Sequence, residues 1–451
     1  MKTTDLLKAV IIGCLILICT GSMLAQDWPQ WRGPNRDGKA IKFSVPEKWP
    51  EKLTPKWKIM VGEGTDSTPA LVGDKLYVFT RQGGNEVILC VDADTGKEIW
   101  KDSYAAEANL SADRDHPGPR SSPAVADGMV VTFGISGTLS CLDISGNIKW
   151  RKNDFPGALP RFNTAMSPII VDGLCIGQFG GQNNGVVVAY DLATCEQKWK
   201  WNSPGTNHSS PNVITVEGMK MAVVMTASNV VGINIANGAL LWEMPFDPGR
   251  RQCVTPIIDG QNVICCGGEG IKAVAIKKDG DSFSVNELWN YSENAVEYNT
   301  PVLKDGLLFA FSQRGNYFCV NAKTGEAVWT QSTGGTAFNT SRNSSVTVAF
   351  ASFAAGGGAR GGRGGGMRGG RGGRGGGMRN AGFGSVVDAG SVLIGLNASS
   401  KLVVFEPNTK EYKELASYKV SDGQTYAYPI VSGNRIFIKD QESLALFKVE
   451  L

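Results

Sequence analysis

Residues that could carry chemistry are few in this chain. It has only two histidines, His116 and His208, and neither has a second metal ligand at useful spacing. The run Asp113-Arg114-Asp115-His116 combines carboxylates with an imidazole, but its setting between Pro- and Gly-rich stretches favours a solvated loop. No Gly-x-Ser-x-Gly elbow, phosphate-binding loop or calcium loop is present. These patterns predict neither a zinc site nor a recognisable hydrolytic centre.

The cysteines are the other reactive residues. Adjacent Cys265 and Cys266 lie in an apolar run typical of a strand, where alternation sends neighbouring side chains to opposite faces, so we interpret them as packing residues. Counting outwards from a hairpin turn at Asp259-Gly260 places Cys253 opposite Cys266, within reach of a disulfide, and both a bridge and a thiol pair remain open. Three further cysteines share one repeat position and are predicted to be buried thiols: Cys90, Cys141 and Cys319.

A repeat must position these residues. Each unit begins with Ser/Thr-x-Pro or Ser-Pro, continues through short apolar runs separated by turns such as Asp-Gly, and closes with Thr-Gly-x-x-x-Trp or a relic of it. The unit starts are marked by Pro69, Pro123, Pro168, Pro211, Pro256, Pro301 and Pro429. A further unit without proline or tryptophan is visible in residues 385–390, 392–396, 401–406 and 409–415. Four strands per unit of about 45 residues predict an all-β, eight-bladed propeller of four-stranded antiparallel blades.

The two ends of the chain complement each other. The last unit starts at Thr425 and stops without a tryptophan strand, whereas Thr54 to Ile59 contains Trp57 without a preceding unit. We therefore expect an N-terminal strand to complete the last blade and close the ring, which removes exposed sheet edges. The predicted organisation is a signal peptide over 1–25, a leader over 26–53 and a propeller over 54–451.

Residues just before the unit starts should surround one mouth of the central channel. Those residues include Asp66, Asn299 and Tyr426, and a basic subset is a candidate site for a carboxylate, sulfate or glycan. Ordinary loop polarity is the alternative interpretation. The candidate ligand-binding residues are Arg120, Arg161, His208, Arg251 and Arg342.

Composition limits where the protein acts. Lys2 and Lys8 precede an apolar core of about eleven residues, which predicts an export signal cleaved after Ala25 and a mature protein in the periplasm or at the cell surface. Lipidation at Cys14 is left open. The net charge is +3, but residues 356–379 hold six arginines and no acid, so the rest of the mature chain is mildly acidic and nucleic acid is not an expected partner. That Gly/Arg run resembles RGG tracts and is predicted to be a disordered insertion, with contact to a polysaccharide or protein partner as the alternative.

The element Asp92-x-x-Thr95-Gly96-x-x-x-Trp100 and its degenerate copies resemble those of eight-bladed propellers with pyrroloquinoline-quinone (PQQ) type repeats. The leader from Asp27 to Pro34 resembles that of exported, planctomycete-type members. The resemblance implies one of two functions. One is a non-catalytic scaffold for a protein or polymer partner, similar to the propeller subunit of the outer-membrane β-barrel assembly machine.

The second function is a PQQ-dependent alcohol or sugar dehydrogenase. It implies a quinone and Ca²⁺ at the channel, a carboxylate base, and adjacent cysteines that form a ring against the cofactor. The chain shows Cys265-Cys266 but no clear set of Glu, Asn and Asp ligands. We therefore expect a soluble monomer without a cofactor, and keep the dehydrogenase as the alternative.

Overall fold

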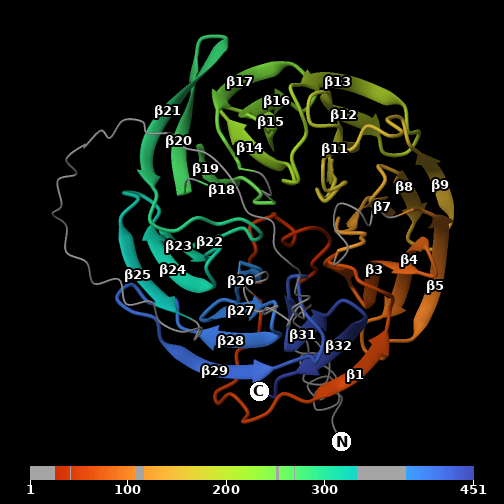
Figure 1. Ribbon diagram of the computed structural model, residues 1–451, viewed down its shortest axis with the longest axis vertical. Coiled ribbons are helices and arrows are strands. Elements are labelled where there is room, and N and C mark those ends of the chain that lie inside the picture. The colour runs from red at the N-terminus through yellow and green to blue at the C-terminus, as the bar shows by residue number, and fades with distance from the viewer. Residues whose placement is uncertain are drawn as a thin grey trace, which may run out of the picture.

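The protein is an eight-bladed β-propeller. The computed structural model describes residues 26–40, 42–107, 116–249, 253–268, 270–332 and 382–450. Figure 1 shows the blades arranged in a ring, and each is a four-stranded antiparallel sheet. Within the described residues there is no helix long and apolar enough to cross a membrane. The all-β, eight-bladed prediction is confirmed.

The first four blades follow the chain in order, with the first strand of each nearest the axis. Blade 1 contains β2 (Ala70–Val72), β3 (Lys75–Gln82), β4 (Asn85–Asp92) and β5 (Glu98–Ala105). Blade 2 contains β6 (Ala124–Ala126), β7 (Met129–Phe133), β8 (Leu139–Asp143) and β9 (Ile148–Lys152). Blade 3 contains β10 (Ile169–Val171), β11 (Leu174–Gly180), β12 (Gly185–Asp191) and β13 (Gln197–Ser203). Blade 4 contains β14 (Asn212–Val216), β15 (Met219–Met225), β16 (Asn229–Asn234) and β17 (Leu240–Pro245).

The remaining blades continue the ring and close it. Blade 5 contains β18 (Ile257–Asp259), β19 (Asn262–Gly267), β20 (Gly270–Asp279) and β21 (Ser282–Tyr291). Blade 6 contains β22 (Val302–Lys304), β23 (Leu307–Phe311), β24 (Asn316–Asn321) and β25 (Ala327–Ser332). Blade 7 contains β26 (Gly384–Asp388), β27 (Leu393–Asn397), β28 (Lys401–Phe405) and β29 (Glu414–Lys419). Blade 8 contains β30 (Ile430–Ser432), β31 (Arg435–Lys439), β32 (Ser443–Lys448) and β1 (Pro55–Met60).

Ring closure occurs as predicted. Strand β1 pairs antiparallel with β32, so that Trp57 lies opposite Leu446 and Met60 opposite Ser443. Segments from the two ends of the chain thereby form one sheet (Figure 1). No open edge is left between the first and last blades.

In six blades the turn between the third and fourth strands receives a tryptophan from the preceding blade. In blade 1 the Asp92 carboxylate accepts the Thr95 backbone N–H at 2.8 Å, and Gly96 takes φ +72°, which permits close approach of Trp57. The Trp57 indole N–H donates to the Ala93 carbonyl at 3.2 Å. The same contact recurs through Trp100, Trp150, Trp199, Trp289 and Trp329.

The Ser/Thr-Pro starts also join neighbouring blades. The hydroxyl before a proline accepts the backbone N–H of the matching residue in the preceding blade, as in Ser122 to Ser167 at 2.9 Å and Ser167 to Ser210 at 2.8 Å. Blade 7 has lost this Ser/Thr-Pro signal. The Tyr428 hydroxyl of blade 8 instead reaches blade 6, accepting the Thr300 N–H at 2.7 Å. Tyr428 therefore connects the two blades on either side of the degenerate one.

Two sequence predictions of local register are wrong. Asp259 pairs with Asn262, so the β18–β19 turn is Gly260-Gln261 rather than Asp259-Gly260. Strand β18 begins at Ile257, so Cys253 lies before the ladder. Cys253 is not joined to Cys266, because none of the described cysteines forms a disulfide.

The second correction concerns blade 7. Its fourth strand is Glu414–Lys419 rather than 409–415, because a longer loop replaces the Thr-Gly turn.

The leader lies inside the ring. Its residues 26–44 bond to inner strands, or residues next to them, in seven blades: through Leu71, Val125, Ile170, Thr255, Thr300, Asp388 and Ser432. In Figure 1 this segment runs as a red trace into the centre. The sequence analysis distinguishes the leader from the propeller, but no sequence pattern indicates that the leader occupies the channel.

Candidate functional site

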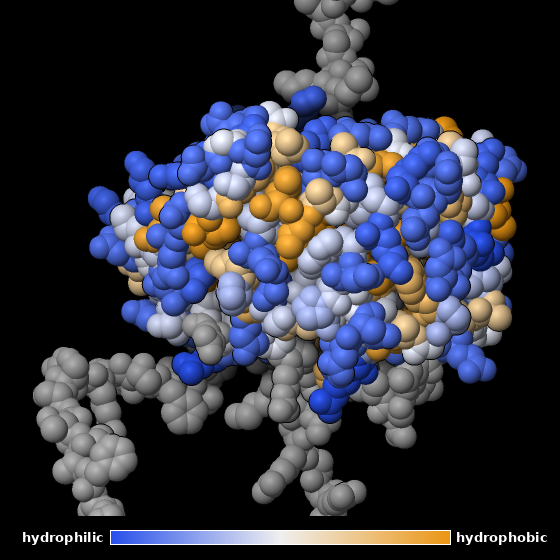
Figure 2. All heavy atoms as spheres, turned by 90° about the horizontal axis from the view of Figure 1, so that it is seen from above, coloured by the Kyte–Doolittle hydropathy of each residue, from blue (hydrophilic) through white to orange (hydrophobic). Residues whose placement is uncertain are grey.

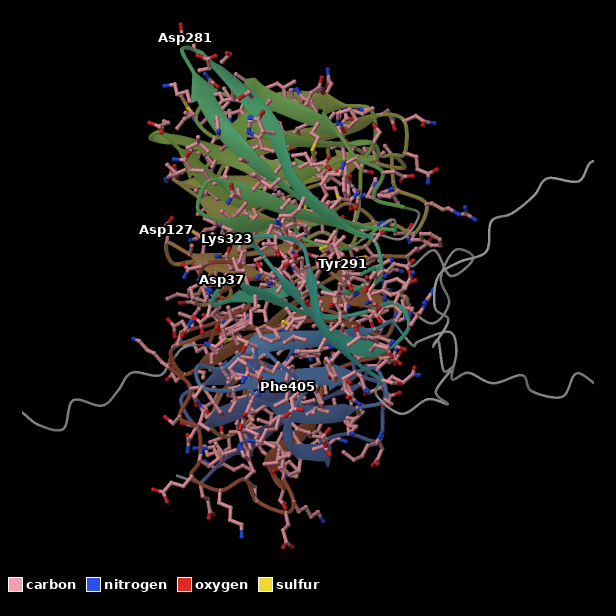
Figure 3. All side chains as sticks on the ribbon, turned by 90° about the vertical axis from the view of Figure 1, so that its left-hand side faces the viewer. Asp37, Asp127, Asp281, Tyr291, Lys323 and Phe405 are labelled. Carbon is pink, nitrogen blue, oxygen red and sulfur yellow. The ribbon has the colours of Figure 1, made fainter. Side chains whose placement is uncertain are left out.

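The channel has two faces that differ in their residues. The turn face carries the Asp-Gly turns between first and second strands, and Figure 3 places Asp37 and Asp127 towards it. The mouth face carries the segments that precede the first strands, including Asp66, Arg120 and Tyr426. Of the predicted ligand-binding residues, Arg120, Arg161 and His208 belong to the mouth face, because each of them lies in a connection that leads to a first strand.

An imidazole–carboxylate pair lies at the mouth. His116 Nδ1 is 2.5 Å from Asp66 Oδ2, and only 8% of the His116 surface is exposed. The prediction of a solvated loop is therefore wrong for His116, whereas Asp113 to Asp115 lie outside the described residues. The sequence could not reveal the pair, because Asp66 and His116 are fifty positions apart and belong to different segments.

Three aromatic rings, from the segments before blades 6, 7 and 8, pack around this pair. Phe383 stacks on Tyr298 with centroids 3.9 Å apart and on His116 at 5.3 Å, and Tyr426 packs edge-on against both His116 and Phe383. All three aromatic side chains are half-buried. One side of the mouth is therefore an aromatic wall, of which the sequence identified only Tyr426.

The other side of the mouth is polar. The Arg120 guanidinium donates to the His116 carbonyl at 2.6 Å and to the Phe162 carbonyl. Arg161 is exposed, with its guanidinium 5.4 Å from the Phe162 ring centroid. Arg120 and Arg161 thus meet at Phe162, whereas the predicted partners Arg251 and Arg342 lie outside the described residues.

His208 adds an acceptor rather than a charge. Burial, together with the nearby Arg120 charge, lowers the pKa of His208 to about 4, so its imidazole is neutral at pH 7. Its Nε2 is buried without a hydrogen-bond partner, and the same holds for Asp66 Oδ1 and Asn299 Oδ1. Acceptor atoms therefore accompany the arginines, which differs from a purely cationic pocket.

A buried lysine connects the mouth to the ring closure. Lys439 Nζ donates to the Thr65 carbonyl and to Thr65 Oγ1, both at 2.7 Å. Burial lowers the pKa of Lys439 to about 8, an effect that the Asp66 and Asp440 carboxylates oppose. Lys439 therefore fixes the segment before blade 1, which carries Asp66, against blade 8.

The residues fit poorly with the quinone site that the dehydrogenase alternative requires. Cys265 belongs to the apolar cluster shared with blade 4, and Cys266 to the cluster shared with blade 6, so their side chains point to opposite faces of β19. A ring between them against a cofactor would need that strand to be rebuilt.

Comparison of this chain with known proteins gives two kinds of match. The family model described as outer membrane protein assembly factor BamB matches residues 48–200 and 84–331. Outer membrane protein assembly factor BamB of Yersinia pestis is 23% identical over 360 residues, covering 67% of this chain and 88% of that protein.

The second kind of match is to oxidoreductases. Quinohemoprotein alcohol dehydrogenase of Comamonas testosteroni is 26% identical over 189 residues, covering 41% of this chain and 26% of the enzyme. The chain thus spans about a quarter of that enzyme in sequence. The enzyme's crystal structure superposes with a TM-score of 0.59 at 13% identity, covering 96% of this chain and 82% of the enzyme, which shows the shared fold alone.

Proposed function

Because the chain belongs to the family of PQQ-type repeat propellers described as outer membrane protein assembly factor BamB, we propose that it is an exported, non-catalytic scaffold that binds a protein or polymer partner. The mature protein would act in the periplasm or at the cell surface. The proposal assigns the mouth face as the binding surface and no catalytic residue.

The observation that carries the proposal is the leader inside the channel. Trp28 is fully buried and exchanges backbone hydrogen bonds with Leu71 of β2, both at 2.8 Å. Trp31 donates from its indole to Thr255 Oγ1 at 2.8 Å. In a propeller the axis is the usual place for a cofactor or small substrate, and here the chain's own side chains fill part of it. A partner would therefore bind to the surface.

The mouth offers the contacts that such a partner needs. The half-buried aromatic wall of Tyr298, Phe383 and Tyr426 supplies apolar and ring-stacking surface, and Arg161 supplies an exposed cation. The outer rim also exposes large apolar residues on its outer strands, such as Ile99, Leu240 and Leu288, and Figure 2 shows apolar atoms gathered between hydrophilic ones on one side of the rim.

The PQQ-dependent dehydrogenase remains the alternative, favoured by the match to quinohemoprotein alcohol dehydrogenase. It would need a quinone and Ca²⁺ at the channel. The opposed side chains of Cys265 and Cys266 argue against it.

Photo-crosslinking in the envelope of the native host tests the scaffold. A photoreactive amino acid at Arg161 on the mouth face is compared with one at Asp281, at the tip of the projecting β20–β21 hairpin (Figure 3). We expect a discrete adduct from position 161 that Tyr426→Ala weakens, and none from position 281. Sensitivity of the adduct to protease or to glycoside hydrolases distinguishes a protein from a polysaccharide. Adducts from position 281 alone, or from neither position, would contradict the proposal.

A further inference from the structure

Two arginines of the leader lie in the channel in contrasting environments. Arg32 is 1% exposed and donates to the carbonyls of Thr300 at 2.7 Å and Pro301 at 2.8 Å. Further donations go to the carbonyls of Asp37 and Arg36. The guanidinium of Arg32 is therefore solvated by backbone dipoles of the channel wall, which offset the loss of water.

Arg36 has no comparable set of acceptors. Its exposed fraction is 8%, and among the described residues its guanidinium has a single hydrogen bond, a long one of 3.4 Å to the Ile170 carbonyl. No carboxylate among the described residues forms an ion pair with it. Burial alone lowers the pKa of Arg36 to about 10, with no opposing charge. A buried cation without a counter-charge is costly unless a ligand supplies one.

The backbone holds Arg36 in this position. Arg36 adopts φ +57°, a left-handed conformation that is unfavourable for a residue with a side chain, and its N–H donates to the Gly33 carbonyl at 3.2 Å. Arg32 Nε donates to the Arg36 carbonyl at 3.3 Å. Arg32, whose guanidinium has many acceptors, thus holds the backbone of Arg36, whose guanidinium has few. Strained residues retained in this way are concentrated at ligand sites.

We propose that Arg36 is the centre of a binding site for a compact oxyanion, a carboxylate or phosphate group, at the turn-face end of the channel. The planar guanidinium can donate two parallel hydrogen bonds to such a group. Access is from the turn face, where the neighbouring Asp37 is partly exposed (Figure 3). The Asp37 carboxylate accepts the Lys39 backbone N–H at 3.2 Å. This site is at the opposite end of the channel from the proposed partner surface and is independent of it.

Thermal unfolding with added anions tests the site. The mature chain is melted in sodium phosphate, sodium acetate and sodium chloride at equal ionic strength, together with Arg36→Gln and with Arg161→Gln as the mouth-face control. We expect the Tm of the wild type and of Arg161→Gln to be about 2 °C higher in 10 mM phosphate than in chloride. For Arg36→Gln we expect the same Tm in both salts. A response to acetate as well assigns the site to carboxylates; a response to phosphate alone assigns it to phosphate groups.

Two results would overturn the proposal. One is an equal anion response in wild type and Arg36→Gln. The other is no response in the wild type. Should Arg36→Gln fail to fold, Arg36→Lys keeps the charge but not the two-pronged geometry, and we expect the phosphate Kd measured by calorimetry to rise about tenfold. An unchanged Kd in Arg36→Lys would contradict the assignment.

Discussion

At the scale of single residues, the protonation of His208 decides the charge of the mouth. The sequence offers a cationic pocket of four arginines and a histidine as one interpretation of the mouth, but burial and the Arg120 charge keep the His208 imidazole neutral. Its pKa of about 4 in the folded protein lies below the 6.5 of an unfolded chain. The unfolded state therefore binds more protons between these values, and stability falls as the pH drops from 6.5 towards 4.

His208→Gln should remove this dependence. Between pH 7 and pH 4 we expect the wild type to lose on the order of 3 kcal/mol more unfolding free energy than His208→Gln. Urea titrations at a series of pH values measure the difference. Because the chain has only two histidines, NMR of the ring protons with His116→Gln as the second variant assigns the titration directly. Parallel pH profiles for wild type and His208→Gln would contradict the neutral assignment.

At the scale of elements, the contact between a tryptophan and the next Thr-Gly turn joins the blades. A Cβ at Gly96 would lie 3.0 Å from the Trp57 ring, whereas a Cβ at Gly83 would meet nothing within 4 Å. Both glycines have positive φ, +72° and +55°. Alanine at position 83 therefore measures the free-energy cost of the backbone conformation alone. Alanine at position 96 adds the cost of disturbing the contact with Trp57.

We expect Gly83→Ala to lower the unfolding free energy by about 1 kcal/mol and Gly96→Ala by about 2–3 kcal/mol, because the latter also displaces Trp57. Chemical denaturation of the two variants measures the comparison. Equal losses would show that the tryptophan contact contributes little to blade packing. A larger loss in Gly83→Ala would contradict the role assigned to the turn.

At the scale of the whole molecule, residues 26–60 have two roles. Strand β1 completes blade 8, and the leader before it bonds to inner elements around the ring. Deleting 26–60 should therefore lower the Tm sharply and broaden the transition, because the ring opens and the channel loses its packing. Differential scanning calorimetry measures both effects. A Tm close to that of the full mature chain would contradict the closure.

Removal of residues 356–379 gives the opposite prediction. This run lies outside the described residues, and the sequence predicts a loop outside the blades, whose closure cost grows only logarithmically with length. We expect its deletion to leave the Tm nearly unchanged. A large destabilisation would show that the run belongs to a blade.

The sequence predicts the regular part of this molecule well. Each Ser/Thr-Pro and Thr-Gly-x-x-x-Trp signal is local, so Pro69 or Trp100 marks a strand without knowledge of distant contacts. The long-range features were not predictable. The Asp66–His116 pair, the Phe383 stack and the path of Arg32 and Arg36 depend on which segments the closed ring brings together. The error at Cys253 arose from one assumed turn position, because a hairpin transmits such a shift to every residue that follows.

The central claim is that this propeller is a non-catalytic scaffold, and quinone reconstitution tests it most directly. The full mature chain is titrated with PQQ and Ca²⁺ and assayed for dye reduction over a panel of alcohols and sugars, beside an established quinoprotein dehydrogenase. We predict neither saturable quinone absorbance on the protein nor quinone-dependent dye reduction. Bound quinone with substrate-dependent turnover would contradict the claim and establish the dehydrogenase.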